Sequence, residues 1–520
     1  MSIRGFFFEN KSKILFIIFF AVVLIILFII YFHISSYLMA NSDNAAPILE
    51  ANSVINGNIK LYQWHLSSDN FYSIDLIFYI IFELFTGVKE YLVALVPVSI
   101  YILTLISAIY ISTINLIKKE KFTAILIILG LIGTAPLFLL YQTLSGPDHV
   151  GTILFVLISF ILIFQIIKKG NYYYYLIPFS LISFMYLFGD PISRWIGSIP
   201  IIIFSIIFYI YEKKDNKQAY LLIGISSIAV LILSYILRID TSKFGLFYLL
   251  RIVSGFIHFS QLQSHIYYLI SSILKLQGAY FFGKALLAKT TIIELIRLLV
   301  FLITISSIYI IVRDILKKKI EIDKIDKINL LLILALILNI LAFVFGGIFV
   351  NSFTSRYLIA VPILGSIIIA RYLSPYIIKN KVYIATAGII IFSFIVLFLH
   401  ESVIIKTGNN REKVLSTFLI QHHLKYGYAT YWDAGITTIY TNNNIKVRQV
   451  ISSNNRVYPY LWLSSSEWYT KPANFIIYGN HQTNAVNMKI AINSFGKPRD
   501  IYSIDGFTIL VWNYNITQKL

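Results

Sequence analysis

The sequence contains no cysteine, and charged residues make up only 13% of its 520 residues. The first absence excludes disulfides, CxxC redox chemistry, thiolate metal sites and a cysteine nucleophile. The second excludes an ordinary water-soluble protein, which carries about 25% charged residues. The HExxH, P-loop, GxSxG and GxGxxG motifs are also missing, so zincin, hydrolase and nucleotide-cofactor functions have no support. Hydrophobic residues instead make up 58% of the chain.

The hydrophobic residues fall into runs, and a membrane-spanning helix needs about 20 mostly apolar residues. Eleven runs approach or exceed this length, at 14–34 and at about 91–116, 122–141, 150–167, 172–188, 196–211, 219–237, 291–312, 328–346, 357–377 and 382–400. The first run follows basic residues, is long for a signal peptide and precedes no small-residue cleavage site, so we expect a retained anchor and a cytoplasmic N-terminus.

Basic residues are distributed unevenly between the loops. Lysine and arginine number 43 against 24 acidic residues, and most of the excess lies in alternate short loops, at 118–121, 168–169, 213–217, 313–327 and 379–381. The intervening short loops hold only Arg194 and Arg356. Positively charged loops remain in the cytoplasm, so the excess reflects topology and predicts no nucleic-acid partner. A multi-pass protein of the cell (inner) membrane is therefore expected.

Two further apolar stretches do not fit the alternation as single spans. The stretch 74–86 is short and carries Asp75 and Glu83, which favours an interfacial helix. The stretch 244–288 is dotted with basic residues and predicts either amphipathic helices on the outer face, which we favour, or two short spans, giving thirteen. Residues 1–400 are thus predicted to form an all-α polytopic membrane domain with a first outer loop over about 35–90.

Hydropathy falls sharply after residue 400, and the pattern of residues 401–520 is that of a small extracytoplasmic α/β domain. A helix is expected over 411–425 and another around 484–494. The segments "YGYAT", "IKVRQV", "NFIIYG" and "GFTILVW" are expected to be short strands. The domain is small, so we expect it to lean on the membrane part.

Acidic residues gather on the predicted outer side. Asp43 follows the first span closely, and partial desolvation there raises the pKa of a carboxyl and makes it a better base. Asp69 and Asp75 are rival bases in the same loop. The next outer loop, "YQTLSGPDHVGT", places Asp148 and His149 after a Gly-Pro turn, and a third, "FGDPISRW", contains Asp190.

Each acidic residue also has a purely structural interpretation. Asp43 could cap an interfacial helix, and Asp148 could only shape its turn. His149 could be a hydrogen-bonded turn histidine, and Asp190 could form a surface ion pair with Arg194. These alternatives stay open at the level of the sequence.

Cations on the same side complete a chemical pattern. Carboxylates on separate outer loops, combined with outward-facing arginines, suit transfer of a group from a lipid-linked phosphate to a hydroxyl. A base takes the acceptor proton, and arginine binds the departing phosphate. Arg356 is the main candidate for the phosphate, although it could also be a snorkelling residue. Arg194, Lys243 and Arg251 are further candidates.

The outer loops resemble those of the GT-C superfamily of polytopic glycosyltransferases, which includes protein O-mannosyltransferases and lipid A aminoarabinose transferases. The resemblance rests on "SDNAAPILEANSVINGN" after the first span, on "GPDHVGT" before the fourth, on the number of spans and on the outer C-terminal domain with "GYATYWDAGITTIYTNNNIKVRQV". It implies an inverting transferase that uses a polyprenyl-phosphate sugar. Asp43 then takes the position of the catalytic carboxylate and Asp148 that of the second acidic residue.

The resemblance also bears on cofactors and partners. The second acidic loop has no DxD or ExD pair, which favours a metal-independent enzyme, with a divalent Mg²⁺ or Mn²⁺ as the alternative. The expected partners are the lipid-linked donor, membrane lipids and a glycan, lipid or protein acceptor. Aromatic and acidic residues of the C-terminal domain could line an acceptor groove or simply pack its core: Trp432, Asp433, Tyr458, Trp462 and Trp468. A glycan polymerase or ligase, and a transporter or lipid flippase, are the competing functions.

Overall fold

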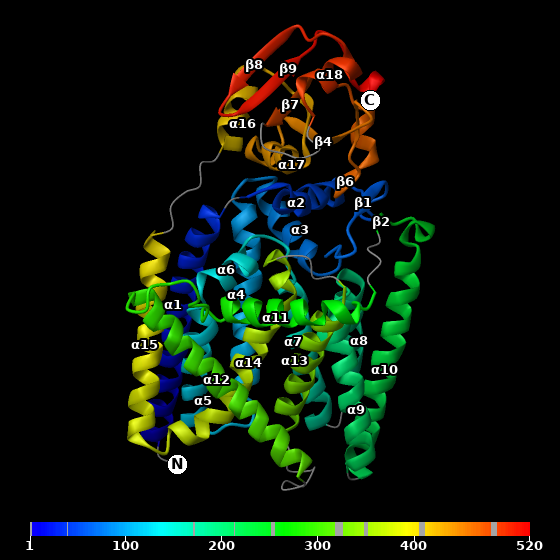
Figure 1. Cartoon of the computed structure of the whole chain (residues 1–520). Helices are drawn as coiled ribbons and strands as arrows, with labels where there is room; N and C mark the ends of the chain where they lie inside the picture. Colours follow the sequence, from blue (N-terminus) through cyan, green and yellow to red (C-terminus); the bar gives the residue numbers. More distant parts are fainter. Residues whose placement is uncertain are drawn as a thin grey trace.

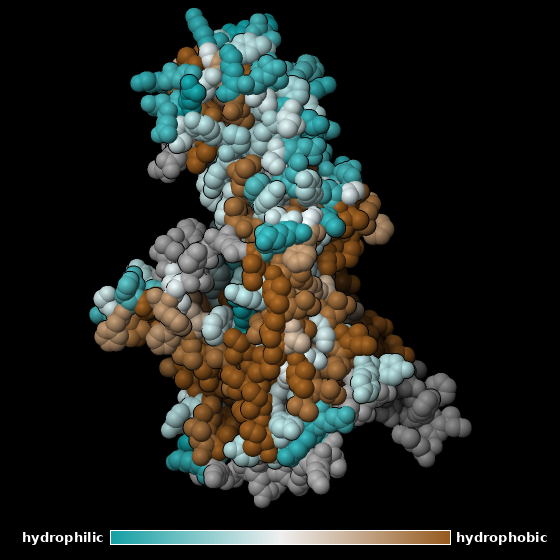
Figure 2. All heavy atoms as spheres, turned by 90° about the vertical axis from the view of Figure 1, so that its right-hand side faces the viewer, coloured by the Kyte–Doolittle hydropathy of each residue, from teal (hydrophilic) through white to brown (hydrophobic). Residues whose placement is uncertain are grey.

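The computed structural model consists of a helical bundle with a small α/β domain on one end (Figure 1). It describes residues 3–38, 40–169, 172–212, 214–250, 255–317, 326–347, 352–404, 411–479 and 486–520. The N-terminus lies at the end of the bundle away from the C-terminal domain (Figure 1). A broad band of apolar side chains covers the bundle, whereas hydrophilic side chains dominate the C-terminal domain (Figure 2). The chain is therefore a multi-pass membrane protein with one large polar end.

Nine helices among the described residues are long and apolar enough to cross a membrane. They are α1 (Ile3–Tyr37), α4 (Leu92–Thr113), α7 (Val150–Lys169), η2 with α9 (Arg194–Tyr211), α10 (Lys214–Ile239), α12 (Lys289–Leu316), α13 (Lys327–Phe345), η6 with α14 (Ser352–Ile377) and α15 (Lys381–Ile404). They match nine of the predicted runs. The run 172–188 forms a shorter apolar helix, α8 (Tyr172–Gly189), so the count of eleven stays a prediction.

The remaining run, predicted as one span over 122–141, is broken. Helix α5 (Lys118–Ile128) with its continuation η1 (Leu129–Gly133) meets α6 (Leu137–Leu144) at 80°. Pro136 precedes α6 and cannot continue the hydrogen-bonded ladder. Buried side chains bond the carbonyls freed at the break, because Tyr101 Oη donates to Ile132 O at 2.7 Å and Tyr31 Oη donates to Gly133 O. The break is thus compensated, as backbone at membrane depth must be.

The two apolar stretches that were not predicted to be single spans, 74–86 and 244–288, contain shorter helices. Residues 74–86 form α3 (Asp75–Thr86), as predicted, and α3 packs against α2 (Ser42–Ile55) of the same outer loop. The second stretch contains α11 (Leu262–Leu276), which runs crosswise over the bundle (Figure 1). No described helix within 244–288 reaches the length of a span.

The C-terminal domain contains a six-stranded sheet of order β5-β4-β3-β7-β9-β8. Its elements are α16 (Arg411–Gln421), β3 (Tyr426–Ala429), α17 (Tyr431–Tyr440), β4 (Lys446–Ser453), β5 (Arg456–Pro459), β7 (Phe475–Gly479), α18 (Met488–Phe495), β8 (Asp500–Ile504) and β9 (Phe507–Val511). Strand β3 is parallel to both β4 and β7, and the outer pairs are antiparallel. The four predicted strands and both predicted helices are present, whereas α17, β5 and β8 were not predicted.

The C-terminal domain is joined to the membrane part by a second, small sheet. Strand β1 (Trp64–Leu66) of the first outer loop pairs with β2 (Tyr248–Leu249) and with β6 (Ser464–Ser465) of the C-terminal domain. Helix α17 lies on α2 beside this sheet (Figure 1). Three segments far apart in the sequence therefore meet at the end of the bundle that carries the C-terminal domain.

Candidate active site

Asp43 lies in the first turn of α2, and it does not cap the helix. Asn41 is the N-cap, because its side-chain oxygen accepts from the backbone N–H groups of Asp43 at 2.8 Å and Asn44 at 3.4 Å. The carboxylate of Asp43 instead accepts a hydrogen bond from the hydroxyl of Tyr431 on α17. Burial raises the pKa of Asp43, although Tyr431 and Arg356 oppose the shift. The group therefore has the environment of a base.

The loop that carries Asp148 comes close to α2. Gly146 has φ +130°, and a Cβ added there would lie 2.6 Å from Asn44 Nδ2, so both the conformation and the space require glycine. Asp148 Oδ1 lies 3.4 Å from Nη1 of Arg356 in η6 (Ser352–Leu358). Burial raises the pKa of Asp148, with Arg356 opposing the shift and the charge of Asp43 adding to it. The structure thus brings Asp43, Asp148 and Arg356 into one electrostatic cluster.

His149 and Asp190 form a buried pair beside this cluster. His149 Nδ1 lies 2.6 Å from Asp190 Oδ2, which also accepts from Thr152 Oγ1 at 2.5 Å. Burial alone would lower the pKa of His149, but Asp190 and the neighbouring carboxylates raise it to about 9. Burial alone would raise the pKa of Asp190, but His149 and the donated hydrogen bonds lower it. Asp190 therefore pairs with His149, and the surface ion pair with Arg194 is not formed.

Asp69 joins the cluster from a loop that is tied to α8. Ser68 Oγ donates to Asp69 Oδ1 at 2.9 Å, and Asn70 Nδ2 donates to Phe188 O at 3.0 Å. The buried guanidinium of Arg238, in the last turn of α10, donates to Ser68 O at 2.7 Å and also to Phe188 O. Burial and the charge of Asp190 raise the pKa of Asp69, while His149 lowers it. Arg238 thus positions the segment that carries Asp69, a role that was not predicted from the sequence.

The other residues predicted to bind the phosphate do not pair with the acids of this cluster in the described part of the chain. The side chain of Lys243 is 78% exposed and its ammonium lies 3.6 Å from Asp240, so the structure does not bring it to the acids. Arg194 opens η2 one turn after Asp190 and is half-buried. Arg251 lies outside the described residues. Arg356 is therefore the predicted phosphate ligand that the structure places against an acid of the site.

The structure leaves the metal prediction open. Within the described ranges, no group of three or more histidine or acidic residues could hold a metal ion. Asp43 and Asp148 are the two carboxylates that could share a hydrated divalent cation. A requirement for Mg²⁺ or Mn²⁺ stays a prediction.

Behind the cluster, α2 and α3 bury further acids against each other. Asp75, Tyr79 and Glu83 share one face of α3, and Glu50 lies on α2. Burial raises the pKa of Asp75 to about 7, that of Glu83 to about 7 and that of Glu50 to about 8. Gly151 is needed here, because a Cβ at that position would lie 2.2 Å from Asp75 Oδ2. Asp75 was predicted only as a rival base, and its carboxyl is buried between α3 and Gly151 of α7.

The buried Glu50 predicts a fall in stability with rising pH. Its pKa is raised from 4.5 to about 8, so the stabilisation by the neutral acid is complete below pH 4.5 and is lost as the pH rises to about 8. The loss approaches about 1.4 kcal/mol for each pH unit in this range. Thermal unfolding in detergent should show Glu50→Gln more stable than the wild type at pH 8.5 and similar at pH 5. The exposed Glu90→Gln is the control, and parallel curves for all three proteins would contradict the assignment.

The hydrogen bond from Tyr431 predicts a shift of the pH–rate profile. It lowers the pKa of Asp43, so Tyr431→Phe should raise this pKa and move the acidic limb of the activity profile upward by about one pH unit. Tyr458→Phe, an exposed tyrosine of the same domain, should leave the limb in place. An unshifted limb in Tyr431→Phe would show that Asp43 does not set it.

No protein-family model matches the sequence, and no curated protein matches it. Among solved structures, the chain is similar to the Archaeoglobus fulgidus oligosaccharyltransferase in its apo form, with 10% sequence identity and a TM-score of 0.47. The match covers 88% of this chain and 69% of that chain. At this level of identity we transfer no residue role from that protein.

Proposed function

We propose that this protein is an integral-membrane glycosyltransferase of GT-C type, which transfers a sugar from a polyprenyl-phosphate donor to a hydroxyl of an extracytoplasmic acceptor. The proposal rests on one observation. Asp43 and Asp148, on different outer loops, share a partly buried cluster with Arg356 at the polar end of the bundle. In this proposal the polar end faces outward from the cell membrane and the N-terminus faces the cytoplasm.

The reaction is a single displacement at the anomeric carbon. Asp43 accepts the proton of the acceptor hydroxyl, whose oxygen attacks this carbon as the bond to the lipid phosphate oxygen breaks. Arg356 binds the departing phosphate and stabilises the charge that develops on it. Inversion of the anomeric configuration follows, because no covalent sugar–enzyme intermediate is formed.

The neighbouring side chains position Asp43 and Arg356 for this reaction. Asp148 orients Arg356 through their ion pair. The His149–Asp190 pair, buried beside Asp148, holds the Asp148 loop against the segment after α8. Asp69 is held near Arg356 by the contacts of Ser68 and Arg238. In this scheme His149 and Asp190 are positioning residues.

A transfer assay tests the proposal. Purified protein in liposomes is given a radiolabelled polyprenyl-phosphate hexose and a mixed glycan and lipid acceptor fraction from the outer face of the same membrane. Sugar in a water-soluble or new lipid product, with free polyprenyl phosphate as the second product and an inverted anomeric linkage by NMR, is the expected result. Donor that moves between leaflets without bond cleavage would favour a flippase instead.

A further inference from the structure

A groove lies between the C-terminal domain and the first outer loop, separate from the acidic cluster. It has two connected parts, of about 230 and 250 Å³, which share Lys446, Arg448, Glu467 and Trp468. The first part adds β3 and Lys471, and the second adds the side of α2 that carries Leu49 and Asn52, together with Trp64 of β1. We call this cavity the Arg448 groove.

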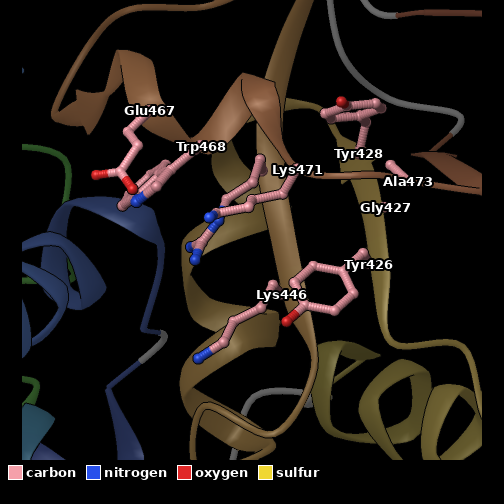
Figure 3. Close-up of a pocket in the computed structure, with 9 residues that line it drawn as sticks. Tyr426, Gly427, Tyr428, Lys446, Glu467, Trp468, Lys471 and Ala473 are labelled. Carbon is pink, nitrogen blue, oxygen red and sulfur yellow. The ribbon is translucent and has the colours of Figure 1, made fainter. Parts of the chain in front are cut away.

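The charge of the groove is positive. Lys446, Arg448 and Lys471 line it against a single acid, Glu467. Lys446, Lys471 and Glu467 extend toward the same side as the ring of Trp468 (Figure 3). Burial lowers the pKa of Lys446 to about 8 and that of Arg448 to about 10, which still leaves both groups mainly protonated at neutral pH. An anion is therefore favoured in the groove.

Arg448 is prepared to bind such an anion. Its guanidinium lies 3.9 Å from the centroid of the Trp468 ring, which fixes the plane of the group. Its Nη1 is buried and has no hydrogen-bond partner among the described residues. Leaving a buried charged donor unpaired is costly, and a planar guanidinium pairs best with a carboxylate or phosphate. An oxyanion in the groove would supply the missing hydrogen-bond acceptor.

The other lining groups suit a sugar. Trp64 and Trp468 meet edge to face at 4.9 Å between ring centroids. Trp64 is fully buried and donates to Ser53 Oγ, so the half-buried Trp468 is the ring that a ligand can reach. Four side-chain amides surround the second part: Asn52, Asn56, Asn58 and Asn443. Asn52, Asn56 and Asn443 each already donate one hydrogen bond within the protein and Asn58 donates two, so the first three retain one N–H for a sugar hydroxyl. The strands β1, β3 and β4 each have neighbours on both sides, so they offer no free edge to an extended peptide.

From these contacts we infer that the Arg448 groove binds an anionic glycan, with an acidic sugar unit held by Arg448. This inference names the acceptor class and rests on the proposed function. Helix α2 links the two sites, because Asn52 lies nine residues after Asp43, or about 14 Å along a helix that rises about 1.5 Å per residue. The two side chains are about two and a half turns apart and therefore leave opposite sides of α2, so an oligosaccharide that reaches from the groove to Asp43 has to pass around the helix.

A binding experiment tests the inference without requiring sugar transfer. The full-length protein in nanodiscs of neutral lipid is titrated with a fluorescent oligosaccharide of alternating uronic acid and N-acetylhexosamine units. The matched ligand is the same oligosaccharide with each carboxyl group reduced to a hydroxymethyl group. We expect the acidic form to bind at least about tenfold more tightly, as a charge-assisted pair with Arg448 requires.

Variants locate the binding site. Arg448→Gln should bind the acidic form at least about tenfold more weakly and lose the preference over the reduced form. Lys471→Gln serves as a second variant in case Arg448→Gln fails to fold, and it should weaken binding of the acidic form to a smaller degree. Lys497→Gln replaces an exposed lysine outside the groove and should leave binding unchanged. Asp43→Asn should retain full binding, which separates this test from failure of the transfer assay.

Three results would overturn the inference. One is equal affinity for the acidic and reduced oligosaccharides. Another is a glutamate-rich peptide of equal charge that binds as tightly, which would point to a protein acceptor. The last is displacement of the bound oligosaccharide by inorganic phosphate at a lower concentration than free uronate needs, which would show that the groove binds a phosphate group.

Discussion

Asp43→Asn should reduce sugar transfer by about 10²–10⁴-fold, the range that a general base contributes. Asparagine keeps the size of the side chain and can still contact Tyr431, but it cannot accept the acceptor's proton at neutral pH. The loss should therefore fall on kcat and leave the affinity for the donor nearly unchanged. Initial rates with a radiolabelled polyprenyl-phosphate sugar measure kcat, and donor binding is measured separately with an unreactive analogue.

Two further acids of the first outer loop separate the base from its rivals. Asp69→Asn removes a carboxylate of the same cluster, and Asp75→Asn replaces a buried acid whose pKa is raised to about 7, so that about half of it is ionised at neutral pH. Both should retain more activity than Asp43→Asn. If Asp43→Asn keeps near-normal kcat while one of the other two loses it, the base lies at that position. Asp505→Asn, at an exposed turn of the C-terminal domain, controls for general effects.

Arg356→Ala should raise the KM for the donor by about 10–100-fold, which corresponds to loss of a charge-assisted hydrogen bond to phosphate. The KM for the acceptor should change much less, because the acceptor does not contact this guanidinium in the proposed reaction. Arg356→Lys keeps the charge and loses the bidentate geometry, so it should fall between the wild type and Arg356→Ala. Steady-state kinetics with each substrate varied in turn provide the two KM values.

Two other arginines complete this test. Arg194→Ala removes the rival cation beside Asp190, and Arg499→Ala removes an exposed arginine of the C-terminal domain. Both should leave the donor KM within about twofold of the wild type. An unchanged donor KM in Arg356→Ala, or a larger increase in Arg194→Ala, would place the phosphate elsewhere.

The sequence predicted the parts of the fold that depend on local pattern. Apolar runs and basic loops predicted eleven spans, nine of which are helices of spanning length in the described part of the chain, and strand alternation predicted β3, β4, β7 and β9. The break between α5 and α6 was missed because hydropathy alone does not detect it. Pro136 and the glycines of η1 were the available signals.

The same distinction applies to the candidate site. Asp43, Asp148 and Arg356 were predicted because residues next to span ends on one side of a membrane share a surface. Lys243 met the same criterion, but the chain turns at η3 (Thr241–Phe244) and leaves it exposed. Tyr431 was not predicted as a partner of Asp43, because no local pattern shows that α17 packs on α2. Arg238 could have been noticed in the sequence, since a basic residue at the predicted outer end of a span departs from the rule that lysine and arginine gather on the cytoplasmic side.

The contact between Tyr431 and Asp43 also limits how early during synthesis the site can be completed. These residues are 388 positions apart, and β6, which completes the small sheet around β1, lies still later in the chain. During synthesis the loop that carries Asp43 and β1 is made long before Tyr431 and β6 are translated. The acidic cluster therefore acquires its final hydrogen bond only after translation has nearly finished, so a nascent or truncated chain lacks a complete site.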